Sequence, residues 1–289
     1  MTDQISDDNT AAAFCADLVR SHDFARYAAT LFLPADMRRA LLALYAFNVE
    51  ITRVRDQVSQ ALPGEIRLQW WTDMLAGHAH GSAEGNPVAA ELMHVIGLGE
   101  LPVEKLSRLI EEHQFDLYND PMPTMAALEG YLNDTSSALF ALAAQIAGGP
   151  PSPEVDHLAR HAGLAQGFVH VIASLAHDAS RRQLFLPQQV LAQHGSDLEE
   201  VFAGKLTQRV RSAVDQLLAE ARGHLETAYG LLGEAPEEVR PVFLPLALVR
   251  RDLRRLSRPD NDPFAPQPPS RLSTLWTLWR ASRSKQFGR

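Results

Sequence analysis

Two pairs of polar residues have the spacing that metal-dependent chemistry uses. Thr52 and Asp56 stand four residues apart, and Ser174 and Asp178 repeat that spacing. In a helix, residues so spaced share one face. Carboxylates placed in this way on two facing helices would hold hard divalent cations such as Mg²⁺, and Mg²⁺ can draw a diphosphate away as a leaving group. Because each pair keeps one carboxylate, we predict only a weak, vestigial Mg²⁺ site at Asp56 and Asp178.

Arginines accompany both pairs. Arg53 and Arg55 interleave with the first pair, and Arg181 and Arg182 follow the second. Two interpretations are open at this point. In the first, the two aspartates form structural ion pairs with these arginines. In the second, the arginines bind the oxygens of a diphosphate or a similar anion, and the predicted binding residues are then Tyr45, Arg53, Arg181 and Arg182.

Two facing helices are needed to bring these residues together. Residues 163–187 read as a helix that ends in a basic turn, and residues 36–58 read as a second helix. Each has one face with small and polar side chains, which a buried face seldom carries unless a polar group lies opposite. We interpret the two faces as walls of one vestigial cavity with Tyr45, Thr52, His170 and Ser174 at its centre, and we assign none of them a catalytic role. The faces comprise Gly163, Gly167, His170, Ser174, Asp178 and Arg181 on one helix and Leu41, Tyr45, Asn48, Thr52 and Asp56 on the other.

The remainder of the chain is also helical in pattern. No stretch shows the alternation typical of strands, and no internal repeat is present. We predict disorder for residues 1–10 and a single all-α domain for residues 11–289. Breaks are expected at Pro63-Gly64 and at residues 148–153. Further helices are predicted at 11–32, 65–76, 88–98, 102–119, 124–147, 207–232, 236–257 and 272–285, with short ones at 188–194 and 197–202.

The composition excludes several classes of protein. The 289 residues are 46% hydrophobic and carry a net charge of −8, which argues against nucleic-acid binding. The single cysteine, Cys15, rules out an internal disulfide. The first ten residues lack the pattern of a signal peptide, and no apolar run approaches the roughly 20 residues that span a bilayer. We therefore expect a cytoplasmic protein.

The segment 270–289 is predicted to form a basic helix and tail. From 271 onward it has five basic residues and no acidic one, and Leu272, Leu275, Trp276 and Trp279 lie on one face. A basic helix with tryptophan on its apolar side is typical of peripheral contact with a membrane. The alternative is a terminal helix docked on the core with its arginines in water.

Histidines form one further cluster. Glu154, His157 and His161 share a helix face. A zinc site would need a fourth ligand or an open position, and the alternative is that the histidines are packed or solvated.

Several longer segments resemble the squalene/phytoene synthase family. They are LFLPADMRRALLALYAF (31–47), RLQWW (67–71), the helix around Tyr131, and GLAQGFVHVIASLAHDASRRQLFLP (163–187). This resemblance implies an all-α, isoprenoid-synthase-type helical bundle around a central cavity. It also implies an Asp-x-x-x-Asp motif on each of two facing helices in catalytic members, which are Mg²⁺-dependent head-to-head prenyl transferases.

The chain departs from that catalytic pattern at several positions. Thr52 and Ser174 replace the first aspartate of each motif, and His170 and Ala173 replace an asparagine and an arginine before the second. Phe140 stands where a small glycine would leave room for a prenyl chain. Changes even beside a metal typically cost about 10–100-fold in affinity or activity. We therefore expect a pseudoenzyme that needs no cofactor.

These departures resemble one non-catalytic branch of the family, the assembly factors of mitochondrial respiratory complex I and their bacterial relatives. The matching segments include AFNVE (46–50), VRDQVS (54–59), YLNDTSS (131–137) and SRRQLFLP (180–187). The resemblance implies a role in the assembly of NADH dehydrogenase (complex I) at the inner membrane. Its partners would be complex I subunits or assembly intermediates, with an isoprenoid or lipid as a further ligand. The alternative is a divergent prenyl transferase that uses Mg²⁺ and allylic isoprenyl diphosphates to make squalene- or phytoene-like products.

Overall fold

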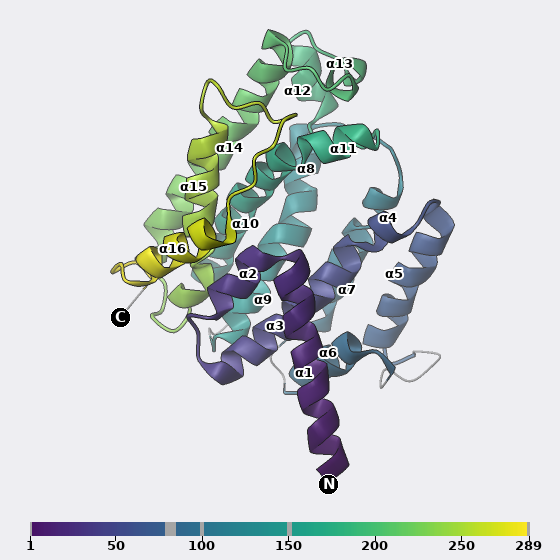
Figure 1. Cartoon of the computed structure of the whole chain (residues 1–289), viewed down its shortest axis with the longest axis vertical. Coiled ribbons are helices and arrows are strands. Elements are labelled where there is room, and N and C mark those ends of the chain that lie inside the picture. The colour runs from purple at the N-terminus through teal and green to yellow at the C-terminus, as the bar shows by residue number, and fades with distance from the viewer. Residues whose placement is uncertain (1, 79–84, 99–100, 149–151, 288–289) are drawn as a thin grey trace.

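The helices gather around one hydrophobic core from which the N-terminal helix projects (Figure 1). The structure, a computed structural model, describes residues 2–78, 85–98, 101–148 and 152–287. Within these residues every regular element is a helix. No helix among them is both long and apolar enough to cross a lipid bilayer.

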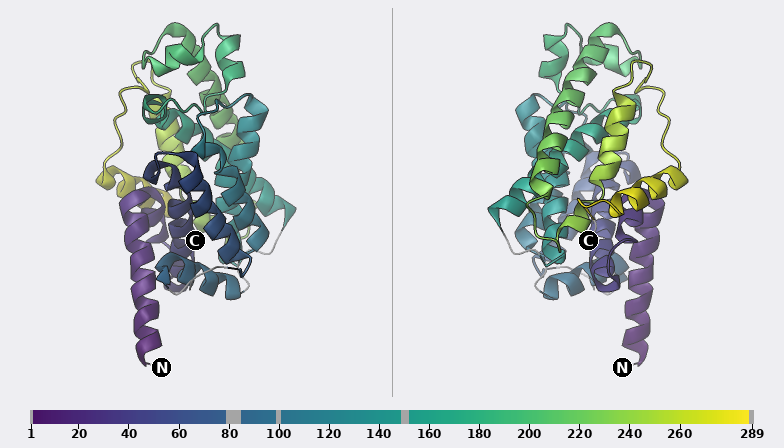
Figure 2. Two further views of the ribbon diagram at one scale, coloured as in Figure 1. Left: turned by 90° about the vertical axis from the view of Figure 1, so that its right-hand side faces the viewer. Right: turned by 90° about the vertical axis from the view of Figure 1, so that its left-hand side faces the viewer.

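The first four helices carry the N-terminal motif. They are α1 (Thr2–His22), α2 (Phe24–Thr30), α3 (Ala35–Thr52) and α4 (Val54–Gln57). The carboxylate of Asp23 accepts a hydrogen bond from the backbone N–H of Arg26 at 3.0 Å, which caps α2 and separates it from α1. Disorder was predicted for residues 1–10, whereas α1 begins at Thr2. Once a helix is nucleated, each further residue adds one backbone hydrogen bond, so the helix propagates outward (Figure 2).

The next elements form the outer edge of the bundle. They are α5 (Ala61–Leu75), α6 (Pro87–Gly97), α7 (Val103–Glu112) and the short 3₁₀ helix η2 (Phe115–Leu117). The break predicted at Pro63-Gly64 does not occur, because α5 runs through both residues. Proline is tolerated in the first turn of a helix, where the backbone N–H has no partner within the helix.

The stretch predicted as one helix at 124–147 is continuous but not uniform. It comprises α8 (Met125–Leu132), a π-helical turn η3 (Asn133–Ser137) and α9 (Ala138–Ile146). The Thr124 hydroxyl accepts a hydrogen bond from the N–H of Ala127 at 3.1 Å, so the predicted N-cap is confirmed.

The C-terminal half contains the longest contact between helices, which α10 (Pro153–Ala173) makes along α14 (Gln208–Leu232). Short helices follow α10 before the chain reaches α14, and α15 and α16 then pack over α10, α14 and α2. The remaining elements are α11 (Leu175–Ser180), α12 (Gln188–Gln193), α13 (Leu198–Phe202), η4 (Arg240–Phe243), α15 (Leu246–Leu256) and α16 (Arg271–Ser282).

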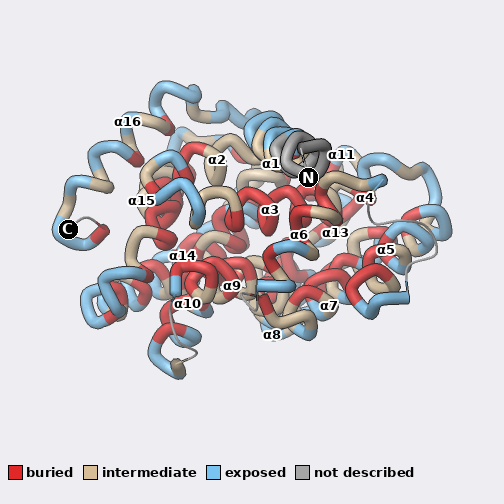
Figure 3. Tube along the Cα trace, turned by 90° about the horizontal axis from the view of Figure 1, so that it is seen from below, coloured by how far each residue is buried: buried red, intermediate tan, exposed pale blue. Residues whose placement is uncertain are grey.

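Aromatic side chains pack together in the interior of the bundle. Phe140 is buried, and its ring stacks on that of Phe243 with centroids 5.4 Å apart and an angle of 2° between the planes. Figure 3 shows the buried residues running through the centre of the bundle. Two hollows of about 470 Å³ and about 430 Å³ lie elsewhere, one between α14 and α15 and the other beside α7, η3 and α10.

Candidate functional site

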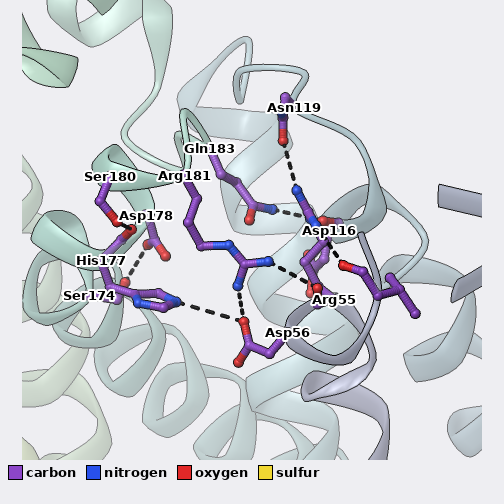
Figure 4. A network of polar contacts seen from close by, with 11 residues as sticks. Arg55, Asp56, Asp116, Asn119, Ser174, His177, Asp178, Ser180, Arg181 and Gln183 are labelled. Atoms are coloured by element: carbon purple, nitrogen blue, oxygen red, sulfur yellow. Dashed lines mark hydrogen bonds and ion pairs between the residues drawn. The ribbon is translucent and has the colours of Figure 1, made fainter. Parts of the chain in front are cut away.

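Both predicted motif helices break at the motif itself. α3 ends at Thr52 and α4 begins at Val54, while α10 ends at Ala173 and α11 begins at Leu175. Each pair of motif residues therefore straddles a break between two helices. Arg53 and Ser174 occupy the breaks and keep right-handed helical backbone angles, so the chain continues in nearly the same direction. The two segments approach each other where α4 faces α11 (Figure 4).

Arg181 joins the two motif segments. Its Nη1 donates a hydrogen bond to the carboxylate of Asp56, and its Nη2 donates to the backbone carbonyl of Arg55 at 3.0 Å. The ring nitrogen Nε2 of His177 lies 3.8 Å from Asp56 Oδ1. Figure 4 shows the guanidinium of Arg181 extended across the space between α11 and α4. Arg181 thus ties the second motif to the first, and the first of the two open interpretations holds for Asp56.

Asp178 is bound differently. The Ser174 hydroxyl donates a hydrogen bond to Asp178 Oδ2 at 2.6 Å, and the residue is 9% exposed. Burial raises the pKa of the Asp178 carboxyl, while the hydrogen bond from Ser174 opposes that rise. No arginine pairs with Asp178 within the described residues. The two aspartates therefore have separate partners.

The residues present do not fit the Mg²⁺ cluster of catalytic members. The hydroxyl of Thr52 donates to the backbone carbonyl of Asn48 at 3.0 Å, within its own helix. Asp56 is neutralised by Arg181, and Asp178 is desolvated beside Ser174. In the described parts of the chain, no three His, Cys, Asp or Glu side chains are grouped so that they could hold a metal ion.

Of the predicted anion-binding residues, Tyr45 belongs to a different cluster. It is 5% exposed, and burial raises its pKa to about 12. The guanidinium of Arg26 lies 5.6 Å from the centroid of its ring, and Arg26 also donates to Asp23 at 2.5 Å and to Gln166 at 2.9 Å. Tyr45 is about 16 Å along the helix from Asp56, at 1.5 Å per residue, so it does not meet Arg181.

The other predicted polar residues are also dispersed. Arg182 has a φ of 55°, and its side chain pairs with Glu199 and lies over the ring of Phe202, 4.6 Å from the centroid. Arg53 is half-buried at the break after α3, and His170 is exposed on α10. Of the predicted set, the structure brings Asp56 and Arg181 into direct contact, and separately Ser174 and Asp178.

The two glycines of the small-residue face on α10 pack against another part of the bundle. A Cβ atom added to Gly163 would lie 2.2 Å from Ser137 Cα, and one added to Gly167 would lie 2.4 Å from Leu132 Cδ2. These glycines let α10 approach α8 and η3 closely. The prediction that this whole face lines a cavity is therefore wrong at Gly163 and Gly167.

A buried polar network beneath the site was not predicted. The hydroxyl of Tyr131 donates to Asp116 Oδ1 at 2.9 Å, and His113 Nδ1 lies 2.6 Å from Asp116 Oδ2. The Gln183 side chain donates to the backbone carbonyl of Asp116 at 3.1 Å. Burial and Asp116 raise the pKa of Tyr131 well above its ordinary value. Tyr131 and Gln183 lie in segments that the sequence singled out, whereas Asp116 carried no signal of its own.

The three-histidine chain connects α10 to α14. His161 Nδ1 lies 2.8 Å from His224 Nδ1, and His161 Nε2 lies 3.0 Å from His157 Nε2. The two contacts use opposite nitrogens of His161, so one metal ion could not engage all three rings. The alternative of packed or solvated histidines therefore describes this chain, with His161 half-buried and His157 exposed.

Comparison with known proteins identifies the family. A family model described as Squalene/phytoene synthase matches residues 19–280. The chain belongs to the squalene/phytoene synthase family. The crystal structure of squalene synthase HpnC from Alicyclobacillus acidocaldarius resembles this structure with a TM-score of 0.74 at 20% identity, covering 89% of this chain and 96% of that one. The predicted all-α, isoprenoid-synthase-type fold is thereby confirmed.

Within the squalene/phytoene synthase family, the chain is more similar to one group of relatives than to another. It is 32% identical to mouse (Mus musculus) NADH dehydrogenase (ubiquinone) complex I, assembly factor 6, over 253 residues that cover 88% of this chain and 76% of the relative. It is 23% identical to 15-cis-phytoene synthase of Synechococcus elongatus, over 264 residues that cover 86% and 85%. The predicted relation to the complex I assembly factors is confirmed, and the likeness to phytoene synthases is more distant.

Proposed function

We propose that this member of the squalene/phytoene synthase family assists the assembly of NADH dehydrogenase (complex I) without catalysing prenyl transfer. The observation that carries the proposal is the Arg181–Asp56 ion pair. It occupies the place where, by the family resemblance, catalytic members hold a diphosphate through Mg²⁺. The similarity to complex I assembly factor 6 supports the assembly role.

Release of a diphosphate requires positive charge close to its oxygens. Metal catalysis supplies several kcal/mol of charge stabilisation, which requires carboxylates free to bind the metal. Here one aspartate engages an arginine, and the other has a raised pKa beside a serine hydroxyl. Phe140, at a position where the family resemblance implies a small glycine, stacks on Phe243 in the interior. The proposed protein therefore acts through binding surfaces and needs no Mg²⁺.

The proposed partners are complex I subunits or assembly intermediates. The proposed location is the inner face of the membrane in which complex I resides, with a peripheral contact through residues 271–289. An isoprenoid or a lipid is the proposed small ligand.

A deletion strain of the source organism tests the assembly role. We expect loss of NADH:quinone activity and of assembled complex I on native gels, with hopanoid, sterol and carotenoid contents unchanged. Normal complex I activity in the deletion strain would refute the assembly role, whatever its isoprenoid content.

Retention of Asp56 and Asp178 favours a second candidate function, a divergent head-to-head prenyl transferase. Its test is incubation of the purified chain with farnesyl or geranylgeranyl diphosphate and Mg²⁺, with diphosphate release as the readout. Release that depends on Mg²⁺ and falls by at least about 10-fold in Asp178→Asn would support turnover. Under the primary proposal, release stays at the rate seen without protein.

A further inference from the structure

The outer side of α16 exposes large apolar side chains. Leu272 is 79% exposed, Trp276 62% and Trp279 38%. Their spacing of four and three residues places them on one face of the helix. The indole rings of Trp276 and Trp279 stack with centroids 4.9 Å apart. We call these three residues the tryptophan face.

The opposite side of α16 anchors the helix to the protein. Thr274 and Leu278 are buried, and the guanidinium of Arg251 on α15 donates to the Thr274 hydroxyl at 3.2 Å. Figures 1 and 2 show α16 lying across the flank of the bundle near α2 and α15. The helix is therefore docked, as one sequence-based interpretation held, yet its tryptophans point outward and are not part of that docking.

Basic residues border the C-terminal end of the tryptophan face. Arg280 lies in the last turn of α16 and Arg283 caps it, with Lys285 three residues beyond Ser282. The guanidinium of Arg271, at the start of the helix, lies instead over the Phe24 ring of α2, 4.7 Å from its centroid. The guanidinium of Arg283 lies over the Trp279 ring, 4.3 Å from its centroid. Residues 246–289 contain ten Lys and Arg against three Asp and Glu, a net +7, so the remaining 245 residues carry −15 of the total −8. The charge of the molecule is thus strongly asymmetric.

We infer that the tryptophan face and the basic side chains around it dock the protein on the surface of an anionic lipid bilayer. Indole rings are stable at the boundary between headgroups and acyl chains, because one end is apolar and the other is polar. Basic side chains near an anionic surface add electrostatic attraction. The acidic remainder of the molecule is repelled by the same surface, which orients α16 toward it.

A bilayer suits this surface better than a folded protein partner does. A standard protein interface buries about 800 Å² on each side around a central apolar cluster. The tryptophan face consists of three side chains on one peripheral helix, and its surroundings are basic. A small apolar face with a basic border is sufficient for an interfacial helix. The inference does not depend on the proposed role in complex I assembly.

Sedimentation with vesicles tests the inference on the full chain. The probes are vesicles of phosphatidylcholine alone and vesicles with about 30% phosphatidylglycerol. We expect binding to the anionic vesicles only, weakened by salt above physiological ionic strength because exposed charges are then screened. The double variant Arg280→Gln/Arg283→Gln should bind about 10-fold or more weakly, at about fivefold per basic residue near the surface.

The apolar part of the face is tested with Trp276→Ser/Trp279→Ser. This variant should lose at least about 10-fold in partition, because interfacial binding scales with the apolar area inserted. A matched control is Leu62→Ser/Ile66→Ser on α5, whose side chains are 63% and 62% exposed; it should bind as the wild type does. Equal circular dichroism and melting temperatures verify that each variant is folded.

Three outcomes would overturn the inference. They are equal binding to neutral and anionic vesicles, unchanged binding by the tryptophan variant, and a dimer in solution that the tryptophan variant abolishes. Complex I activity of the same variants in a deletion strain is measured separately. Failure of vesicle binding with normal complementation would refute the docking surface alone, whereas failed complementation by the wild-type chain would refute the assembly role alone.

Discussion

Arg181 is the residue that joins the two motif segments. Its side chain is 23% exposed and connects two segments that are 125 residues apart in sequence. An arginine so placed supplies the positive charge that a metal ion would otherwise bring to Asp56. Asp56 is thus neutralised by the protein itself.

We predict that Arg181→Gln lowers the free energy of unfolding by about 1 kcal/mol, because a half-exposed ion pair and one backbone hydrogen bond are lost. Urea denaturation measures the change. Arg182→Gln is the matched control, since its pair with Glu199 is 59% and 71% exposed; it should leave the midpoint of urea unfolding nearly unchanged, because exposed ion pairs contribute little to stability. Equal effects of the two substitutions would contradict the structural role given to Arg181.

At this scale the sequence predicted which residues to examine but not how they pair. The spacing of Asp56 and Asp178, with arginines nearby, indicated either ion pairs or an anion site. The choice between ion pairs and an anion site depends on how α4 and α11 face each other. A local sequence pattern does not contain that information. Tyr45 and Arg182 were placed at the site because of their positions along the two predicted helices, whereas in the structure Tyr45 is buried beside Arg26 and Arg182 pairs with Glu199.

At the scale of elements, the approach of α10 to η3 fixes the centre of the bundle. We predict that Gly163→Ala destabilises the protein by about 2 kcal/mol or more, because the added Cβ would meet the backbone of Ser137. Gly223→Ala on α14 is the matched control. It has no atom within 4 Å of the added Cβ, so it should stabilise by about 0.5–1 kcal/mol through helix propensity. Thermal unfolding measures the effect of each substitution. Stabilisation by both substitutions would contradict the close packing of α10 against η3.

The histidine chain makes the contact of α10 with α14 sensitive to acid. Burial, with His224 and His157 nearby, lowers the pKa of His161 to about 4. The unfolded value is about 6.5, so the unfolded chain binds the proton more readily. The neutral His161 ring therefore makes its full contribution to stability above about pH 6.5, and this contribution is lost as the pH falls toward 4.

We therefore predict that His161→Gln loses less stability than the wild type between pH 7 and pH 4.5. The difference is about 1 kcal/mol, because the ring is largely solvent-screened. Urea denaturation across this range measures it. His94→Gln, an exposed histidine of α6, should follow the wild-type curve. Parallel curves for all three proteins would show that His161 is not linked to folding.

The boundaries of most helices followed from capping and proline signals, while their interruptions did not. The sequence predicted Thr124 as an N-cap, and the structure agrees. It did not predict the π turn at Asn133–Ser137 or the breaks at Arg53 and Ser174. The π turn lies where η3 packs closely against Gly163 of α10, so it depends on a tertiary contact that a local pattern does not contain.

At the scale of the whole molecule, one fold serves relatives as different as a complex I assembly factor and a phytoene synthase. The overall architecture was predictable because several segments together resemble the family. The packing of the interior was harder to predict, because Phe140 stacks on Phe243, about a hundred residues away in the sequence. The distribution of charge, with a basic C-terminal region on an acidic body, was readable directly from the sequence.

The most direct measurement is complementation of a deletion strain by Asp56→Asn/Asp178→Asn. Asparagine keeps the oxygen that accepts hydrogen bonds from Arg181 and Ser174, yet it removes the charge that any Mg²⁺-dependent reaction would need. We predict NADH:quinone activity within about twofold of that restored by the wild-type chain, at an equal protein level. Restoration by the wild type but not by the double variant, with both proteins folded and equally abundant, would contradict a role without turnover.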